Sequence, residues 1–198
     1  NPMARVPKPI VPPVEIPMPT IEELRSLLDA CKGRDVVSRR DYALITMLLD
    51  TGLRLTEVTN LKLDDISEDY TLRVFGKGRK WRTVQLGQKS SEALRRWIRM
   101  RKSESDRLWI GRVGPLTASG VRRIVKKRGQ QVGIHLHPHM LRHSFVDNWL
   151  RCGGSEIDLA RLCGWTTTRM AGRYAQHRAD ERAIAAHAVV RPLDGMLP

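Results

Sequence analysis

Apolar residues recur at helical spacing along most of the chain, and residues that favour helix N-termini precede several of these segments. Thr20, followed by Glu23 three positions later, forms a capping box before the first segment. The residues expected to cap later helices are Ser38, Thr117, Ser155 and either Thr166 or Thr167. The predicted helices cover residues 20–30, 38–51, 53–61, 90–102, 117–132, 138–150, 155–163, the segment around Tyr174, and 180–190.

The hydrophobic period changes to two in the middle of the chain. Residues 71–75 and 81–86 have the composition and alternation of strands, and a glycine-flanked turn at 76–80 joins them into a hairpin. The predicted fold is therefore α+β and mostly helical, with a small antiparallel sheet packed on a helical bundle. The first 19 residues hold seven prolines, which disfavour a helix and predict a linker to a domain that this chain lacks.

Basic residues are in excess and are clustered. Among 198 residues, 35 Lys and Arg stand against 21 Asp and Glu, a formal net charge of +14. Between positions 71 and 102, eleven residues are basic and only Glu92 is acidic. This clustering favours nucleic acid as a partner over the alternative of a merely soluble basic protein. The residues expected to contact DNA are Arg79, Lys80, Arg122, Arg123, Lys126 and Lys127.

The composition argues against several other classes of protein. An apolar content of 41% argues against global disorder, and the absence of a run of 18 apolar residues argues against a membrane span, so no membrane partner is expected. The N-terminal segment lacks the apolar block of a secretory signal. Three cysteines, far apart and without a CxxC pair, suit a reducing compartment and exclude a disulfide framework. We therefore expect a cytoplasmic protein.

Four histidines between positions 135 and 143 raise the question of a metal site. His139 and His143 stand four residues apart, but no glutamate follows His139 as it does in a metalloprotease helix. The acidic pairs at 64–65 and 68–69 look like solvated loop charges and not like ligands for two metals. We expect neither a metal nor a cofactor. Without a metal, phosphoryl transfer needs arginines as donors and a side chain as nucleophile.

Four segments, in the order of the family's motifs, resemble the tyrosine recombinases, the family of the phage integrases. They are Thr51-Gly52-Leu53-Arg54 with Glu57; Gly76-Lys77-Gly78-Arg79-Lys80; His139-Met140-Leu141-Arg142-His143-Ser144; and Leu162-Cys163-Gly164-Trp165 with Tyr174-Ala175-Gln176-His177. The resemblance covers about residues 20–182 and implies the fold of that family's catalytic domain. It also implies site-specific DNA recombination, in which strands are cleaved and rejoined through a 3′-phosphotyrosyl intermediate, as in integration or excision.

The resemblance implies a role for each matching residue. Arg54 and Arg142 would clamp the scissile phosphate with bidentate donors. Tyr174 would be the nucleophile, and His139 would accept its proton. Lys77 would act as the general acid toward the leaving 5′ oxygen. For each residue the alternative is an ordinary structural side chain, such as a tyrosine that packs its helix against the core.

The remaining matches imply supporting roles. Trp165 stands where the family more often has histidine, and its indole N–H would donate one hydrogen bond to a phosphate oxygen. Glu57 would support the active-site arginines, with a helix-surface carboxylate as the alternative. His143 is expected to face inward as structural support. Arg79 and Lys80 are alternatives for the general acid of the hairpin.

The resemblance also predicts how the chain is organised and what it binds. Residues 1–19 would be the proline-rich linker, 20–182 the catalytic domain, and 183–198 a helix and tail that either pack in cis or dock on a neighbouring protomer. Expected partners are double-stranded DNA, further copies of the chain (a tetramer on DNA, a monomer or weak association alone) and DNA-bending accessory proteins. A bacterial or phage-encoded protein at the nucleoid is expected. A type IB topoisomerase-like enzyme, a non-catalytic DNA-binding module and a metal-dependent nuclease are the alternatives.

Overall fold

The computed structural model describes residues 17–76, 80–176 and 179–190. Their order is α1 (Ile21–Ala30), α2 (Val36–Thr51), α3 (Leu55–Asn60), the 3-10 helix η2 (Leu63–Asp65), β1 (Thr71–Phe75), β2 (Trp81–Gln85), α4 (Gln88–Met100), α5 (Ala118–Gln131), α6 (Pro138–Arg151), α7 (Glu156–Cys163), α8 (Arg169–Gln176) and α9 (Ala179–Val190). The predicted fold class is confirmed: the described part is mostly helical and contains one two-stranded antiparallel sheet.

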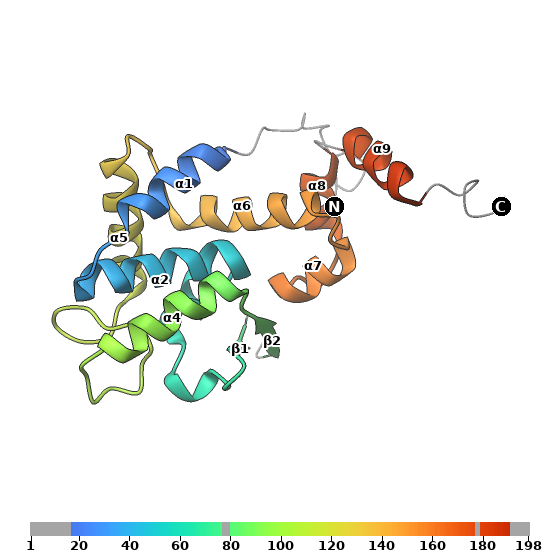
Figure 1. Cartoon of the computed structure of the whole chain (residues 1–198). Coiled ribbons are helices and arrows are strands. Elements are labelled where there is room, and N and C mark those ends of the chain that lie inside the picture. The colour runs from blue at the N-terminus through green and yellow to red at the C-terminus, as the bar shows by residue number, and fades with distance from the viewer. Residues whose placement is uncertain (1–16, 77–79, 177–178, 191–198) are drawn as a thin grey trace, which may run out of the picture.

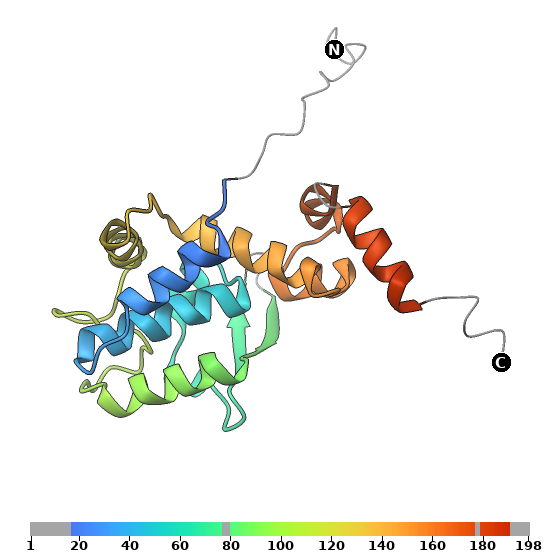
Figure 2. The same ribbon diagram turned by 45° about the horizontal axis from the view of Figure 1, so that its top comes forward.

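The helices form one bundle, and the hairpin lies at one end of it. α2 packs against both α4 and α6, and α5 contacts α1, α3 and α6. Figure 1 shows α5 standing across one end of α2 and α6, while the hairpin, α7 and α8 lie at the other end. In both Figure 1 and Figure 2, α9 lies outside the bundle, beyond α8.

Side-chain caps determine where the first two helices begin. Thr20 Oγ1 accepts a hydrogen bond from the Glu23 N–H at 3.1 Å, and the Glu23 carboxylate accepts one from the Thr20 N–H at 2.7 Å, as the capping box predicts. The cap predicted for α2 is wrong. Asp35, and not Ser38, is the N-cap, and its carboxylate accepts a hydrogen bond from the Ser38 N–H at 2.9 Å. Aspartate caps as well as serine does, so the earlier residue extends the helix.

The later helices follow their predicted caps closely but not everywhere. Thr117 caps α5 and Ser155 caps α7, as predicted. α4 begins at Gln88, two residues before the predicted start. α8 begins at Arg169, because the carbonyl of Thr168 is the first to accept a helical hydrogen bond, from Gly172 at 2.9 Å. The predicted caps of α8, at positions 166 and 167, therefore lie before the boundary of the helix.

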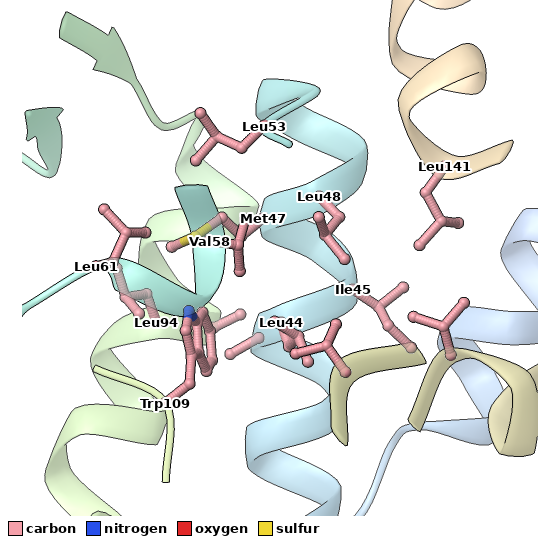
Figure 3. Close-up of a cluster of buried hydrophobic side chains, with 14 of the residues drawn as sticks. Leu44, Ile45, Met47, Leu48, Leu53, Val58, Leu61, Leu94, Trp109 and Leu141 are labelled. Atoms are coloured by element: carbon pink, nitrogen blue, oxygen red, sulfur yellow. The ribbon is translucent and has the colours of Figure 1, made fainter. Parts of the chain in front are cut away.

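The core is built around α2, and a smaller cluster holds the C-terminal helices. Leu44 of α2 is fully buried, and Figure 3 shows α2 between α4, which carries Leu94, and α6, which carries Leu141. The second cluster consists of residues from α6, α7 and α8, and it includes Phe145 and Tyr174. Burial in this cluster positions Tyr174. None of the helices in the described part has both the length and the apolar character that a membrane span requires.

Candidate active site

Three arginine side chains meet at the C-terminal end of α7. The last carbonyl groups of a helix have no partner within it, and they carry the negative end of the helix dipole. Here these carbonyls accept hydrogen bonds from guanidinium groups: Leu162 O from Arg82 Nε at 2.7 Å, Cys163 O from Arg142 Nη2 at 2.9 Å, and Gly164 O from Arg54 Nη2 at 3.2 Å. A helix end therefore gathers three cations that lie far apart in the sequence.

Arg54 reaches this place through a tight turn after α2. Gly52 ends α2 in the left-handed conformation, with φ 57°, and Arg54 is the residue immediately before α3. Glu57, in the first turn of α3, accepts hydrogen bonds from the Arg54 backbone N–H at 2.7 Å and from Arg54 Nη1 at 3.0 Å. The start of α3 thus fixes both the backbone and the guanidinium of Arg54.

Glu57 is a buried carboxylate shared by two arginines. It is 4% exposed, and Arg82 Nη1 and Nη2 donate to its two oxygens at 2.9 and 2.7 Å. Burial alone would raise the pKa of Glu57, but the hydrogen bonds from Arg82 and Arg54 outweigh burial and hold the pKa below its usual value. Glu57 is therefore ionised and is not the helix-surface carboxylate considered as its alternative.

Arg142 joins the two halves of the site. Its Nη1 donates to Gly52 O at the end of α2, and its Nη2 donates to Cys163 O at the end of α7. Burial lowers the pKa of Arg142, yet an arginine remains protonated in proteins. Its guanidinium carbon lies 5.5 Å from the ring centroid of Trp165, which places the indole against the cation. With two of its five N–H donors used on carbonyls, Arg142 retains donors for a ligand.

Tyr174 packs against Trp165, which lies against Arg142 of this cluster. Its ring is stacked on Trp165, with centroids 6.5 Å apart and planes 13° apart, and the residue is 7% exposed. Tyr174 Oη forms a hydrogen bond with Nδ1 of His143. Burial, together with neighbouring positive groups, lowers the pKa of His143, so the imidazole is neutral near pH 7 and has one nitrogen able to accept a proton.

The structure brings most of the predicted site residues together and shows one unexpected contact. Arg54, Glu57, Arg142, Trp165 and Tyr174 lie around the end of α7. His143 was expected to face inward as structural support, but its ring is in contact with the phenol oxygen. His139 is exposed, with its ring 6.4 Å from that of His143.

The remaining candidates are exposed or lie outside the description. Lys77 and Arg79 belong to segment 77–79, which lies outside the described residues, and Lys80 is exposed. The four α5 residues predicted to contact DNA are all exposed: Arg122, Arg123, Lys126 and Lys127. Among the described residues, no group of three or more His, Cys, Asp or Glu side chains is arranged to hold a metal ion.

One site residue was not singled out from the sequence. Arg82 was counted only as part of the basic segment, although its side chain reaches from β2 to the end of α7. The signal that identifies it is the period of the strand, in which residues two positions apart share a face. Val84 is 3% exposed, so Arg82, two positions before it, also lies on the buried face of the hairpin. An arginine at an inward position of a strand needs an acceptor, and here Glu57 supplies it.

Comparison with known sequences identifies a family. A model described as the phage integrase family matches residues 20–181. The tyrosine recombinase XerC of Azotobacter vinelandii is 40% identical over 135 residues, which are 65% of this chain and 45% of that protein. XerC of Pseudomonas aeruginosa PAO1 is 38% identical over 145 residues, 70% of this chain and 48% of that protein. The chain thus spans less than half the length of these curated relatives.

Solved structures of recombinases have the same fold as this chain. A crystal structure of XerA recombinase superimposes with a TM-score of 0.75 and 25% identity, over 95% of this chain and 69% of that chain. XerH recombinase in a pre-cleavage complex with its difH substrate gives a TM-score of 0.69 and 26% identity, over 84% of this chain and 52% of that chain.

Proposed function

The chain belongs to the phage integrase family, and we propose that it cleaves and rejoins DNA through a covalent bond between Tyr174 and a 3′ phosphate. The observation that carries this proposal is the placement of a phenol and two guanidiniums around the end of α7. Tyr174 is stacked on Trp165, and Trp165 in turn lies against Arg142. Arg54 and Arg142 donate to neighbouring carbonyls of the same helix end. This is the set of groups that a metal-free phosphoryl transfer needs.

Arg54 and Arg142 would bind the non-bridging oxygens of the scissile phosphate. Each holds its inner N–H groups on protein acceptors, which fixes the plane of the guanidinium before DNA arrives. A donor that is already oriented stabilises charge in the transition state without reorganising. Trp165 would add one indole N–H toward the phosphate and would hold the phenol by stacking.

The proton of Tyr174 needs an acceptor, because a phenol with a pKa of about 10 is a weak nucleophile at neutral pH. The contact between Oη and His143 Nδ1 supports His143 for this role in the state described. The family resemblance assigns the role to His139, which lies next to His143 on the same helix face. Substituting each histidine with glutamine distinguishes the two. The cleavage rate should rise with pH as the accepting histidine loses its proton, and this rise should disappear only in the variant that lacks the acceptor.

Lys77 is proposed as the general acid for the leaving 5′ oxygen, on the family resemblance. Lys80, at the described end of the hairpin turn, is exposed and is the alternative. Arg79 remains a further alternative. An ammonium group in this place would donate a proton to the oxygen that leaves phosphorus. A DNA substrate with a 5′-bridging phosphorothiolate tests the role: its thiolate leaves without an acid, so it should restore cleavage to the variant that lacks the acid.

Double-stranded DNA is the proposed substrate. The exposed basic side chains of α5 support DNA binding, because cations on one helix can neutralise phosphates and release counterions. The XerH and Tn1549 integrase structures contain those proteins with their DNA. DNA-bending accessory proteins and action at the bacterial nucleoid, in the cytoplasm, complete the proposal, and the bacterial origin of the relatives supports the cellular setting.

We further propose that α9 contacts a second copy of the chain. Its Ile184, Val189 and Val190 are 72%, 84% and 69% exposed, and Figures 1 and 2 place α9 outside the bundle. Exposed apolar side chains gathered on one element favour a protein partner. Because two residues separate α9 from α8, a neighbour that held α9 would also act on the helix of Tyr174. Sedimentation velocity with and without DNA should show assembly on DNA that Ile184→Asp weakens.

Covalent trapping tests the proposed chemistry. The chain is incubated with a nicked suicide DNA, in which cleavage frees a short fragment bearing the 5′ hydroxyl; its loss by diffusion prevents rejoining. A protein–DNA adduct that survives denaturant, and that Tyr174→Phe abolishes, is the expected result. Arg54→Ala and Arg142→Ala should abolish the adduct while DNA is still bound. An adduct that persists in Tyr174→Phe would show that another residue is the nucleophile.

A further inference from the structure

Arg82 is the third guanidinium at the end of α7, and no role in the chemistry has been given to it. We infer that Arg82 is a positioning residue, which orients Arg54 through Glu57 and ties the hairpin to the end of α7. The inference rests on the proposed function, because it assigns Arg82 to the same reaction. Its consequence is that cleavage rate, and not DNA affinity, depends on Arg82.

All three nitrogens of Arg82 are engaged inside the protein. Nη1 and Nη2 donate to the two oxygens of Glu57 at 2.9 and 2.7 Å, and Nε donates to Leu162 O at 2.7 Å. The side chain of Arg82 is 13% exposed, whereas that of Arg54 is 27% exposed. A guanidinium that uses its fork on a carboxylate is held in one plane. Arg82 is therefore oriented toward the protein, while Arg54 faces the site.

Glu57 transmits the position of Arg82 to Arg54. Each carboxylate oxygen accepts two hydrogen bonds: Oε1 from the Nη1 atoms of Arg54 and Arg82, and Oε2 from the Arg54 backbone N–H and Arg82 Nη2. A carboxylate has about four acceptor sites, so these four bonds fill it. Removing Arg82 would empty half of them and leave the carboxylate free to rotate. Arg54 would then lose the partner that fixes its guanidinium.

Arg82 also connects the hairpin to the arginine cluster. β2 begins at Trp81, so Arg82 is two residues after Lys80 of the turn that carries the proposed acid. At the other end of that turn, a Cβ on Gly76 would lie 2.8 Å from Arg82 Nη1 and 3.1 Å from Glu57 Oε1. Gly76, directly after the end of β1, therefore lies directly against the ion pair. A displacement of Arg82 would disturb both the clamp and this end of the hairpin.

The expected effect is a loss of rate with little change in binding. Arg82→Met removes the charge and the donors but retains the aliphatic stem, and it should slow single-turnover adduct formation by about 10- to 100-fold, the range for residues that orient a site. The dissociation constant for the DNA should change by less than about threefold, since an arginine whose three nitrogens all donate inside the protein is not oriented to contact a phosphate. Arg82→Lys should recover part of the rate because it restores one donor and the charge.

The matched control is Arg96→Met. Arg96 forms an exposed pair with Glu92 on α4 at 3.5 Å, so the same substitution changes the net charge equally without touching the site. Its cleavage rate should equal that of the wild type. A double variant with Glu57→Gln separates positioning from general damage: if Arg82 acts through Glu57, then adding Arg82→Met to Glu57→Gln should slow cleavage far less than it slows the wild type.

A pH profile supplies a readout that a merely structural role would not change. The charged groups that face Glu57 are Arg54, Arg82 and Arg142, and Cys163 also lies near it. Burial raises the pKa of Glu57, and the hydrogen bonds from Arg82 and Arg54 lower it. Without Arg82 the effect of burial is opposed less, so the pKa of Glu57 should rise. Cleavage by Arg82→Met, measured relative to Arg96→Met, should therefore fall more steeply as the pH is lowered from 7 to 5.

Thermal unfolding gives a readout that does not depend on DNA chemistry. At neutral pH, Arg82→Met leaves a buried, ionised Glu57 with one arginine partner, whereas acid protonates the carboxyl group and relieves that cost. The loss of melting temperature should therefore be larger at pH 7 than at pH 4, and the effect of Arg96→Met should vary much less. Should Arg82→Met not fold, then Arg82→Lys, with weaker effects of the same kind, takes its place in both assays.

The outcomes separate the two proposals. If the wild type forms no adduct that depends on Tyr174, the proposed function fails, and the pH dependence of unfolding still tests the link between Arg82 and Glu57. If the wild type forms the adduct while Arg82→Met cleaves at the wild-type rate with an unchanged pH profile, the positioning inference alone is overturned. Equal losses of rate and of DNA affinity would also overturn it, because they would make Arg82 a DNA-binding residue.

Discussion

Replacing Gly52 with alanine should destabilise the protein strongly, because two separate constraints meet at this residue. Gly52 has φ 57°, in the left-handed region, where it ends α2. A Cβ at this position would lie 2.9 Å from both Cγ and Cε1 of Phe145, and closer still to Cδ1. Phe145 is 7% exposed and belongs to the cluster that positions Tyr174, so its ring has little room to move.

The two constraints have different magnitudes. A residue with a side chain costs about 1–2 kcal/mol in the left-handed region. Forcing an extra carbon into a packed interior costs a further 1–3 kcal/mol, roughly. The expected loss for Gly52→Ala is therefore about 2–5 kcal/mol of unfolding free energy, out of a total of roughly 5–15 kcal/mol for a domain.

A matched glycine separates the two contributions. Gly133 also has a positive φ, 74°, but a Cβ there would have nothing within 4 Å. In urea unfolding followed by circular dichroism, Gly133→Ala should lose only the conformational part, about 1–2 kcal/mol. Phe145→Leu combined with Gly52→Ala should lose less than the sum of the two single variants. Equal losses for Gly52→Ala and Gly133→Ala would refute the contact with Phe145.

Three further outcomes are expected. Arg128→Met should cost about 3 kcal/mol in urea unfolding, because it removes a 2.9 Å partner of the buried Asp41, although Arg40 still pairs with Asp41; Lys126→Met, exposed on the same helix, should cost little. Burial lowers the pKa of His143, so the unfolded chain binds the proton more tightly, and the unfolding free energy should fall below about pH 6.5 and fall less in His143→Gln. Cleavage should survive excess EDTA; loss of cleavage in EDTA that Mg²⁺ restores would contradict a metal-free clamp.

Local chemistry made most of the elements predictable. The capping box at Thr20 and the alternation of residues 71–75 depend on residues next to one another, and the structure has both. The cap of α2 was wrong because Asp35 and Ser38 are both good caps, and the choice between them depends on how much helix the tertiary structure can pack. Boundaries of this kind are decided by competition between neighbours of nearly equal preference.

The arrangement of the site could be predicted only in part. The motifs indicated which residues belong to it, but not that the end of α7 would supply acceptors to three arginines. Those acceptors are backbone carbonyls, which every residue has, so no side-chain pattern marks them. Arg82 was missed because its partners, the carboxylate of Glu57 and the carbonyl of Leu162, lie 25 and 80 positions away in the sequence. The contact of His143 with the phenol likewise depends on how α8 packs on α6.

The charge of the assembled site explains why a helix C-terminus, which by itself repels anions, can lie at the proposed phosphate-binding centre. Three guanidiniums and the one carboxylate of Glu57 give a formal charge of +2, all within one hydrogen-bonded network. A phosphodiester carries one negative charge, whereas the pentacoordinate state formed by phenolate attack carries two. Fixed cations therefore stabilise the transition state more than they stabilise the bound substrate, and this difference is what accelerates a reaction. The α7 carbonyls keep these like charges together before DNA arrives, because each accepts from a different guanidinium.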